Sequence, residues 1–217
     1  MARSMKSYTI LCRRSKEFRP GFIEYALYPF HEEIATDEAE LISSILCSLH
    51  GTEEREFSAI VYMDHIHREQ FVRILRQEYR NQWTLEHRRA GITIFRATID
   101  EKLVALFVHF IWRMLVNTDF YVPISFSRLR EREKRYFVEF CTNKMSHKFP
   151  LSLLLNRMLF DQFFPIVVTW GHDGNELIVG CEFSVRERVL ERIQKTLKHR
   201  GIPFTSKNEV RFTIFEE

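Results

Sequence analysis

DEKLVALFVHFIWRMLV, residues 100–116, is the stretch around which the fold is organised. After Asp100, a good N-cap, and Glu101, whose charge suits the first turn of a helix, it is apolar almost throughout. From Leu103 on, only His109 and Arg113 interrupt the apolar run. The run is too short and too interrupted for a membrane span, which needs roughly 18 or more apolar residues, so it predicts one buried helix. A helix that is apolar nearly all round must be covered on most sides, and the rest of the chain should supply layers around it.

The composition is that of a globular protein with a large aromatic core. The chain has 217 residues, of which 45% are hydrophobic and 28% charged, and it holds 20 phenylalanines against 7 glycines. So few glycines leave little room for the tight backbone loops that cradle phosphates. The 29 acidic residues nearly match the 32 basic ones, so charge alone gives a weak nucleic-acid signature.

The N-terminus and the cysteines favour a cytoplasmic protein without a membrane span. Residues 1–14 contain no apolar run followed by a small-residue cleavage site, so no signal peptide is expected. The four cysteines form no CxxC pair, and most lie in apolar segments, which favours reduced core thiols over a metal or disulfide framework. They are Cys12, Cys47, Cys141 and Cys181.

The alternation of strand and helix patterns predicts an α+β fold with mostly antiparallel sheet. Runs rich in β-branched and aromatic residues predict strands at 7–14, 21–30, 57–63 and 92–99, a short edge or irregular strand at 121–126, a hairpin over 165–183 and a closing strand at 210–215. Apolar residues at helical spacing predict helices at 36–50, 64–83, 127–145, 151–164 and 184–200. Capping boxes are expected at Asp37 with Glu40 and at Ser184 with Glu187, and Gly201 should end the last helix.

The element order divides the chain into three stretches that should form one globular body. We expect an N-terminal α+β unit at 1–99, an apolar helical middle segment at 100–164 and a C-terminal ββαβ unit at 165–217. Residues 57–98 and 177–215 share an order of strand, amphipathic helix, basic turn with Gly-Ile, and strand. This echo raises the hypothesis of two related ββαβ-type units, although strand–helix–strand orders are common.

DHIHRE, residues 64–69, is the sharpest candidate for chemistry. If His65 and His67 ended the preceding strand, period-two spacing would put both imidazoles on one side, where they could hold a divalent metal. Asp64 or Glu69 could add an oxygen ligand. If the segment instead begins a helix, the two imidazoles diverge by roughly 200° and share no metal.

Two further sets of polar residues stand out. The polar face of the helix predicted at 64–83 carries a set of arginines that few carboxylates neutralise, so it could bind nucleic-acid phosphates. These are Arg68, Arg73, Arg76 and Arg80. In the apolar helix, His109 and Arg113 are expected to be buried polar residues, the histidine hydrogen-bonded in the core and the arginine reaching solvent or a carboxylate.

No stretch carries catalytic chemistry at a specific spacing. Neither GxGxxG nor GxxxxGK[ST] occurs, and there is no GxSxG elbow and no HExxH pair. Phenylalanine and arginine are abundant, and they suit protein interfaces, so we expect a non-enzymatic regulatory or inhibitory protein that acts by protein–protein interaction and needs no cofactor. Two alternatives stay open: a metal-dependent hydrolase or nuclease that uses residues 64–67, and a nucleic-acid-binding protein that uses the arginine face.

Overall fold

The computed structural model describes residues 6–14, 22–30, 35–49, 56–63, 65–79, 82–87, 92–115, 124–125, 166–170 and 175–209. The strands in these ranges are β1 (Tyr8–Arg14), β2 (Phe22–Tyr28), β3 (Glu56–Tyr62), β4 (Trp83–His87), β5 (Ile92–Thr98), β6 (Ile124–Ser125), β7 (Ile166–Trp170), β8 (Leu177–Glu182) and β9 (Phe204–Asn208). The helices are α1 (Thr36–Leu49), α2 (His65–Glu78), α3 (Glu101–Leu115) and α6 (Arg186–His199), the last preceded by a 3-10 turn at Phe183–Val185.

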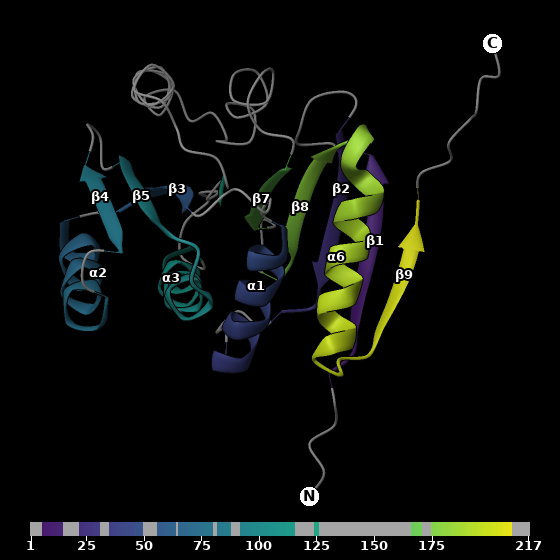
Figure 1. The fold of residues 1–217 in the computed structure, drawn as a ribbon, viewed down its shortest axis with the longest axis horizontal. Coiled ribbons are helices and arrows are strands. Elements are labelled where there is room, and N and C mark those ends of the chain that lie inside the picture. Colours follow the sequence, from purple (N-terminus) through teal and green to yellow (C-terminus); the bar gives the residue numbers. More distant parts are fainter. Residues whose placement is uncertain are drawn as a thin grey trace, which may run out of the picture.

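The nine described strands form one continuous sheet in the order β4-β5-β3-β6-β7-β8-β2-β1-β9. Neighbouring strands pair antiparallel throughout, except β1 and β9, which are parallel. The four described helices lie side by side over one face of this sheet (Figure 1). The predicted α+β class with mostly antiparallel sheet is confirmed.

The middle of the chain forms a complete split βαβ unit. Its elements follow one another as β3-α2-β4-β5-α3-β6, and its strands lie in the sheet in the order β6-β3-β5-β4. This is the ferredoxin-like βαββαβ arrangement, in which both helices cross the same face of an antiparallel sheet. The long apolar helix α3 therefore lies where the chain returns from β5 to the centre of the sheet.

The N-terminal and C-terminal parts of the chain together form a second unit. Its strands have the same spatial order as those of the first unit, but the chain begins at a different strand of that order. The N-terminal part supplies β1-β2-α1 and the C-terminal part supplies β7-β8-α6, and their strands lie in the order β7-β8-β2-β1. In this strand order the strand that follows α6 would lie beside β2, but β1 already occupies that position. The next strand, β9, therefore lies outside β1 and parallel to it. The first unit is thus inserted into the second, and the two meet where Ile124 of β6 pairs with Val168 of β7.

This nesting bears on the domain boundaries expected from the sequence. The division into 1–99, 100–164 and 165–217 stays a prediction. The sheet joins stretches on both sides of its boundaries, because β2 pairs with β8 along its length.

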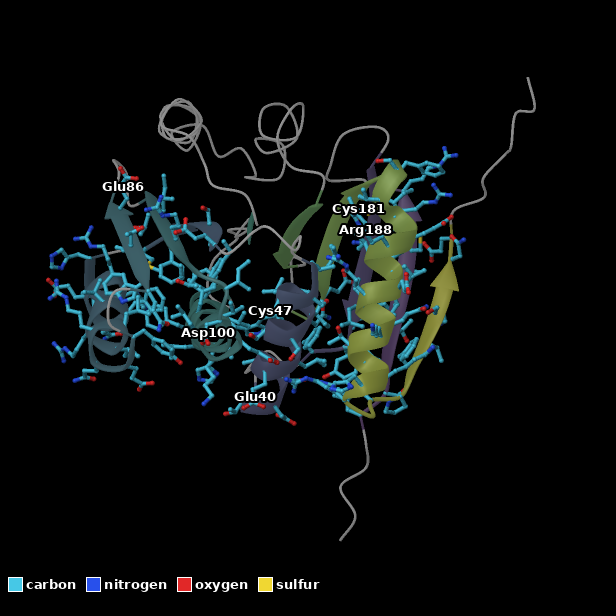
Figure 2. The ribbon with its side chains drawn as sticks, in the orientation of Figure 1. Glu40, Cys47, Glu86, Asp100, Cys181 and Arg188 are labelled. Atoms are coloured by element: carbon cyan, nitrogen blue, oxygen red, sulfur yellow. The ribbon has the colours of Figure 1, made fainter. Side chains whose placement is uncertain are left out.

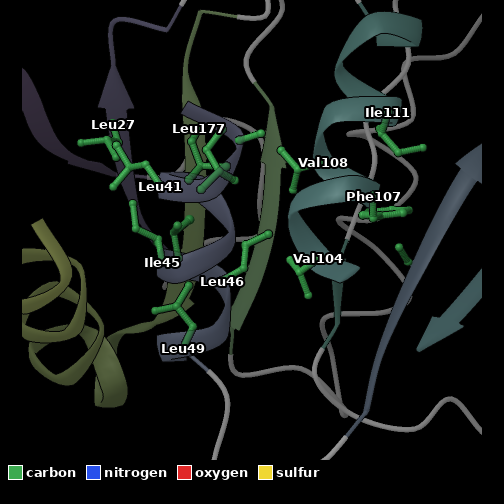
Figure 3. Packing of buried hydrophobic residues seen from close by; sticks show 14 of the residues in the cluster. Leu27, Leu41, Ile45, Leu46, Leu49, Val104, Phe107, Val108, Ile111 and Leu177 are labelled. Atoms are coloured by element: carbon green, nitrogen blue, oxygen red, sulfur yellow. The ribbon is translucent and has the colours of Figure 1, made fainter. Parts of the chain in front are cut away.

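The core lies between the helices and the sheet and is rich in aromatic rings. Phe107 of α3 packs on Phe57 and Phe95 of the sheet, with ring centroids 5.7 and 4.9 Å apart. Figure 3 shows the buried side of α3, from Val104 to Ile111, next to the leucines and isoleucine of α1. No residue of α3 between 103 and 112 is exposed, so the predicted covering of this helix is confirmed over that range.

The face of the sheet that points away from the helices also buries side chains. Buried apolar residues on this face include Ala26, Ile94 and Ile178, each at most 3% exposed and outside the helix-side cluster. Glu24 is wholly buried on this face, and its Oε2 accepts a hydrogen bond from Arg13 Nε at 2.9 Å. Because a buried carboxylate is costly without a cation, Arg13 is a structural residue despite its place near the end of β1.

Three strands differ from the predicted ones. The helix expected at 64–83 ends at Glu78, and Trp83 begins β4 instead. Trp83 fits a helical stripe because it lies four residues after Tyr79, and its Nε1 does donate to the Tyr79 carbonyl at 2.7 Å, but from an extended strand.

The short strand β6 lies between β3 and β7 rather than at an edge. β9 forms ahead of the strand expected at 210–215, which lies outside the described residues, as do the helices expected at 127–145 and 151–164.

Neither predicted capping box forms as expected. α1 begins at Thr36, which puts Asp37 inside the helix, and the carboxylate of Glu38 accepts a hydrogen bond from the Ala35 amide at 3.3 Å. At α6, the 3-10 turn displaces Ser184 from the cap position. Val185 takes that position without a side-chain cap.

Gly201 ends α6 as predicted, and its replacement gives a first test of the fold. Its φ is 66°, its amide donates to the Lys198 carbonyl at 3.0 Å, and the Ile202 amide donates to the Leu197 carbonyl at 2.9 Å, which is the Schellman pattern. We expect Gly201→Ala to lower the free energy of unfolding by about 1 kcal/mol, because a Cβ is strained in the left-handed region. Urea denaturation measures the change. Gly201→Asn should lose less, and equal stability of wild type and the alanine variant would contradict this account.

Candidate functional site

A cleft of about 800 Å³, lined by polar and charged residues, lies where α1, α6 and the first turn of α3 meet. Its described lining is Ser44, Ser48, Glu101, Arg192, Lys195, Thr196, His199 and Arg200. The two long walls run antiparallel, because Arg200, just after α6, lies 4.0 Å from Glu40 near the start of α1, whereas Arg192 reaches Ser48 near its end. Figure 2 shows the same relation, with Glu40 at one end of the helical layer and Arg188, at the start of α6, toward the other.

The spacing of residues along α6 explains why its cations face the cleft. Val189, Ile193 and Leu197 recur at helical spacing and are buried on the sheet. Arg192, Lys195, Thr196 and His199 recur at steps of three and four residues and therefore form a neighbouring stripe on the side of α1. Burial of the first stripe thus orients the second.

Hydrogen bonds to the backbone fix the walls of the cleft. Arg192 Nη1 donates to the Ser48 carbonyl at 2.9 Å, which ties α6 to the last turn of α1. The hydroxyl of Ser48 donates to the Ile45 carbonyl at 2.7 Å, and that of Thr196 to the Arg192 carbonyl at 2.9 Å. These hydroxyl protons are therefore used within their own helices.

Glu101 is the acidic residue of the described lining, and neighbouring side chains donate hydrogen bonds to its carboxylate. Its Oε1 accepts from Arg200 Nη2 at 2.6 Å and also from the hydroxyl of Ser44. The hydrogen bond from Ser44, followed by the hydrogen bond and charge of Arg200, lowers the pKa of Glu101 against the opposing effect of partial burial. This carboxylate therefore stays ionised and bound to Arg200 around neutral pH.

Lys195 and His199 differ from the other charged residues of the lining. Both are exposed, and among the described residues no carboxylate lies within ion-pair distance of either. Cations in the last turns of α6 suit its helix dipole, which accounts for their place along the helix. The dipole does not account for a concave surface beside them, and a cationic concave surface favours anionic ligands.

In the inserted unit, the corresponding helices α2 and α3 are joined by aromatic rings. There the ring of Phe110 on α3 stacks on Phe71 of α2 with centroids 4.6 Å apart, and Phe107 lies 6.1 Å from the same ring. In the second unit, α1 and α6 are also in contact, through the hydrogen bond from Arg192 to Ser48, and polar and charged side chains line the cleft beside that contact.

The residues proposed for metal binding lie elsewhere, on α2. His65 and His67 are exposed in its first turn, and His65 Nε2 is 3.3 Å from Glu69 Oε1, one turn on. Because α2 begins at His65, the strand-end geometry that would aim both imidazoles at one metal is not formed, and the two diverge by roughly 200°. Asp64 lies outside the described residues. Within the described part of the chain, no three His, Cys, Asp or Glu side chains are grouped so that they could hold a metal ion, and the metal hypothesis stays a prediction.

The predicted arginine face and the two polar residues of α3 are also away from the cleft lining. On α2, Arg73 and Arg76 are exposed, Arg68 is half-buried, and Arg80 lies outside the described residues. His109 is half-buried rather than buried, because α3 turns residues such as Phe107 and Ile111 to the core and His109 to another side. The side chain of Arg113 lies outside the described part. Nucleic-acid binding by the arginine face stays a prediction.

The cleft itself is not predicted by the sequence pattern. The stripe of Arg192, Lys195 and His199 is visible as a helical period, but such a stripe is equally typical of a solvated helix face. What distinguishes it is the wall supplied by Ser44, Ser48 and Glu101, which come from distant parts of the chain. The pairing of β2 with β8 brings α1 and α6 together, and the packing of α3 on α1, where the hydroxyl of Ser43 donates to the Glu101 carbonyl, adds Glu101.

Comparison with known proteins adds no relative, since neither a family model nor a curated protein nor a solved structure matches the chain. In the part of the chain that the structure describes, no helix has the length and apolar character needed to cross a membrane.

Proposed function

We propose that this chain is a non-enzymatic regulatory protein that acts by binding an acidic segment of a partner protein in the cleft between α1 and α6. The observation that supports this is the position of Lys195 and His199, which line the cleft without a carboxylate partner among the described residues. Charge complementarity of this kind guides the encounter of two proteins and suppresses wrong partners.

The size and rigidity of the cleft suit a peptide segment. Its volume of about 800 Å³ falls within the range of roughly 300–1,000 Å³ that is typical of ligand sites. The hydrogen bond from Arg192 to Ser48 holds one cation in place before any partner arrives, which reduces the entropy lost on binding. A cytoplasmic location is part of the proposal, because the described cysteines Cys12, Cys47 and Cys181 form no disulfide bond.

The direct test uses a short fluorescein-labelled peptide of alternating glutamate and alanine and follows its fluorescence anisotropy. We expect binding that weakens with salt, and we expect Lys195→Glu to weaken it about tenfold, which corresponds to 1.4 kcal/mol. Lys207→Glu is the matched control, because Lys207 is exposed on β9 and makes the same change in net charge outside the cleft. This control should change binding less than about twofold.

Two results would overturn the proposal. One is the absence of binding to the acidic peptide, or an equal loss in the two charge-reversal variants. The other comes from a labelled single-stranded oligonucleotide of similar length: if it binds more tightly than the peptide and is weakened by Lys195→Glu, the partner is nucleic acid and not protein.

A further inference from the structure

We infer that the acidic segment carries a phosphate monoester and that Arg192, Lys195 and His199 bind this group. The inference rests on the proposed function and names the chemistry that the cleft selects. It is carried by the arrangement of three basic side chains on one stripe of a single helix, within a cleft whose acidic residue is already matched.

The stripe brings its side chains within reach of one group. Lys195 and His199 are one turn apart, a spacing that puts Cβ atoms about 5–6 Å from each other. Arg192 precedes Lys195 by three residues, so all three lie along about 10 Å of helix. The long side chains of arginine and lysine can converge over such a distance on one tetrahedral group.

Each of the three residues contributes a donor of the type that phosphate accepts. The bond from Arg192 to the Ser48 carbonyl fixes its guanidinium at the wall of the cleft, and guanidinium groups bind phosphate oxygens in pairs. Lys195 supplies a compact charge, and His199 supplies a ring N–H. Lys195 and His199 are exposed and so are accessible to a ligand from solvent.

The charges of the cleft favour a phosphate over a carboxylate. A phosphorylated side chain carries a charge of about −1.5 to −2 and three acceptor oxygens, so it can contact several cations at once. A carboxylate carries one charge and two oxygens. Because Glu101 is bound by Arg200 and Ser44, it does not compete for Lys195 or His199.

The hydroxyl groups of the lining sharpen this expectation. Ser48 and Thr196 donate to backbone carbonyls, and Ser44 donates to the Glu40 carbonyl or to Glu101. Recognition therefore falls on the basic side chains rather than on neutral donors. Binding through cations should discriminate strongly by ligand charge and should weaken with salt.

The test compares three labelled peptides that differ at one position, which is phosphoserine, glutamate or serine among alanines and glutamates. We expect the phosphoserine peptide to bind about tenfold more tightly than the serine peptide, with the affinity of the glutamate peptide between the two. Lys195→Ala and His199→Ala should each remove most of this preference. Lys198→Ala is the matched control, because Lys198 is exposed on the same helix but does not line the cleft, and it should preserve the preference.

The outcomes separate this inference from the proposal on which it rests. Equal affinity for the phosphoserine and glutamate peptides overturns the phosphate inference and leaves the binding of acidic segments in place, whereas failure of all three peptides overturns both. An equal loss of the preference for phosphoserine in Lys198→Ala also overturns the phosphate inference, because the position of the basic residues on the cleft side of α6 would then make no difference. Phenyl phosphate is added as a competitor: if its affinity equals that of the phosphoserine peptide, the ligand is a free phosphate compound rather than a protein segment.

Discussion

Phe107→Ala is expected to lower the free energy of unfolding by about 4 kcal/mol, the largest effect of any single substitution considered for this protein. Phe107 is fully buried at the centre of α3, and its ring lies 4.9 Å from Phe95, nearly parallel to it at 10°. The same ring contacts Phe57 of β3 and Phe71 of α2. Truncation therefore leaves a cavity that touches two strands and two helices, and the rigid aromatic rings around it have little freedom to close it.

Urea denaturation followed by circular dichroism measures this loss as a lower midpoint at an unchanged slope. Phe183→Ala is the control, because Phe183 is 43% exposed and its ring mainly covers the guanidinium of Arg186, 3.5 Å from the centroid. We expect a loss of about 0.5 kcal/mol there. Similar losses in the two variants would show that α3 is not the centre of the core.

Arg13→Met is expected to cost about 3 kcal/mol, although Arg13 itself is 23% exposed. The loss of stability comes from its partner, Glu24. Glu24 is wholly buried, and the substitution removes the Nε–H donor at 2.9 Å and the positive charge that balances its carboxylate. Glu176, whose Oε2 lies 3.5 Å from Arg13 Nη2, would lose the same cation.

A double-mutant cycle distinguishes this explanation from simple loss of packing. In Arg13→Met with Glu24→Met the buried charge is gone, so we expect the double variant to recover at least half of the stability lost in the single one. Arg96→Met is the matched control: Arg96 also points away from the helices, but its partner Glu56 is 3.8 Å away and 47% exposed. That variant should lose less than about 1 kcal/mol, and an equal loss would contradict the account.

The local elements of this fold could be predicted from the sequence, because they depend on neighbouring residues. The apolar run after Asp100 forms α3, and the carboxylate of Asp100 does accept from the Leu103 amide at 2.9 Å. The hairpin of β7 and β8 likewise pairs as expected, from Ile166 with Cys181 to Trp170 with Leu177. In both cases a short-range pattern contains all the information that the element needs.

The order of the strands could not be predicted in this way. On the side away from β1, β2 pairs with β8. The local sequence pattern of neither strand indicates that the other is its partner. Trp83 shows the same limit on a smaller scale, since its bond to the Tyr79 carbonyl is compatible with a helical period although the residue lies in β4. Long-range pairing depends on the summed burial of the whole sheet, which a periodicity analysis does not contain.

The cleft follows the same rule. Lys195 and His199 can be assigned to a polar helix stripe from the sequence, but whether such a stripe faces solvent or a concave site depends on what packs beside it. Here the neighbour is α1, which presents Ser44 and Ser48, and the first turn of α3, which presents Glu101. The H-x-H segment is the sharper sequence motif, yet its histidines lie exposed in the first turn of α2.

The insertion of one unit into the other has a consequence for synthesis on the ribosome. β3 through β6 emerge as one continuous stretch, so the inserted unit can complete its sheet as soon as Ser125 is available. β1, β2 and α1 leave the ribosome earlier, but β2 has no partner on its second side until Leu177–Glu182 has been made. The stretch that precedes the inserted unit is therefore completed after it, and during that interval it presents an open strand edge of the kind that chaperones protect.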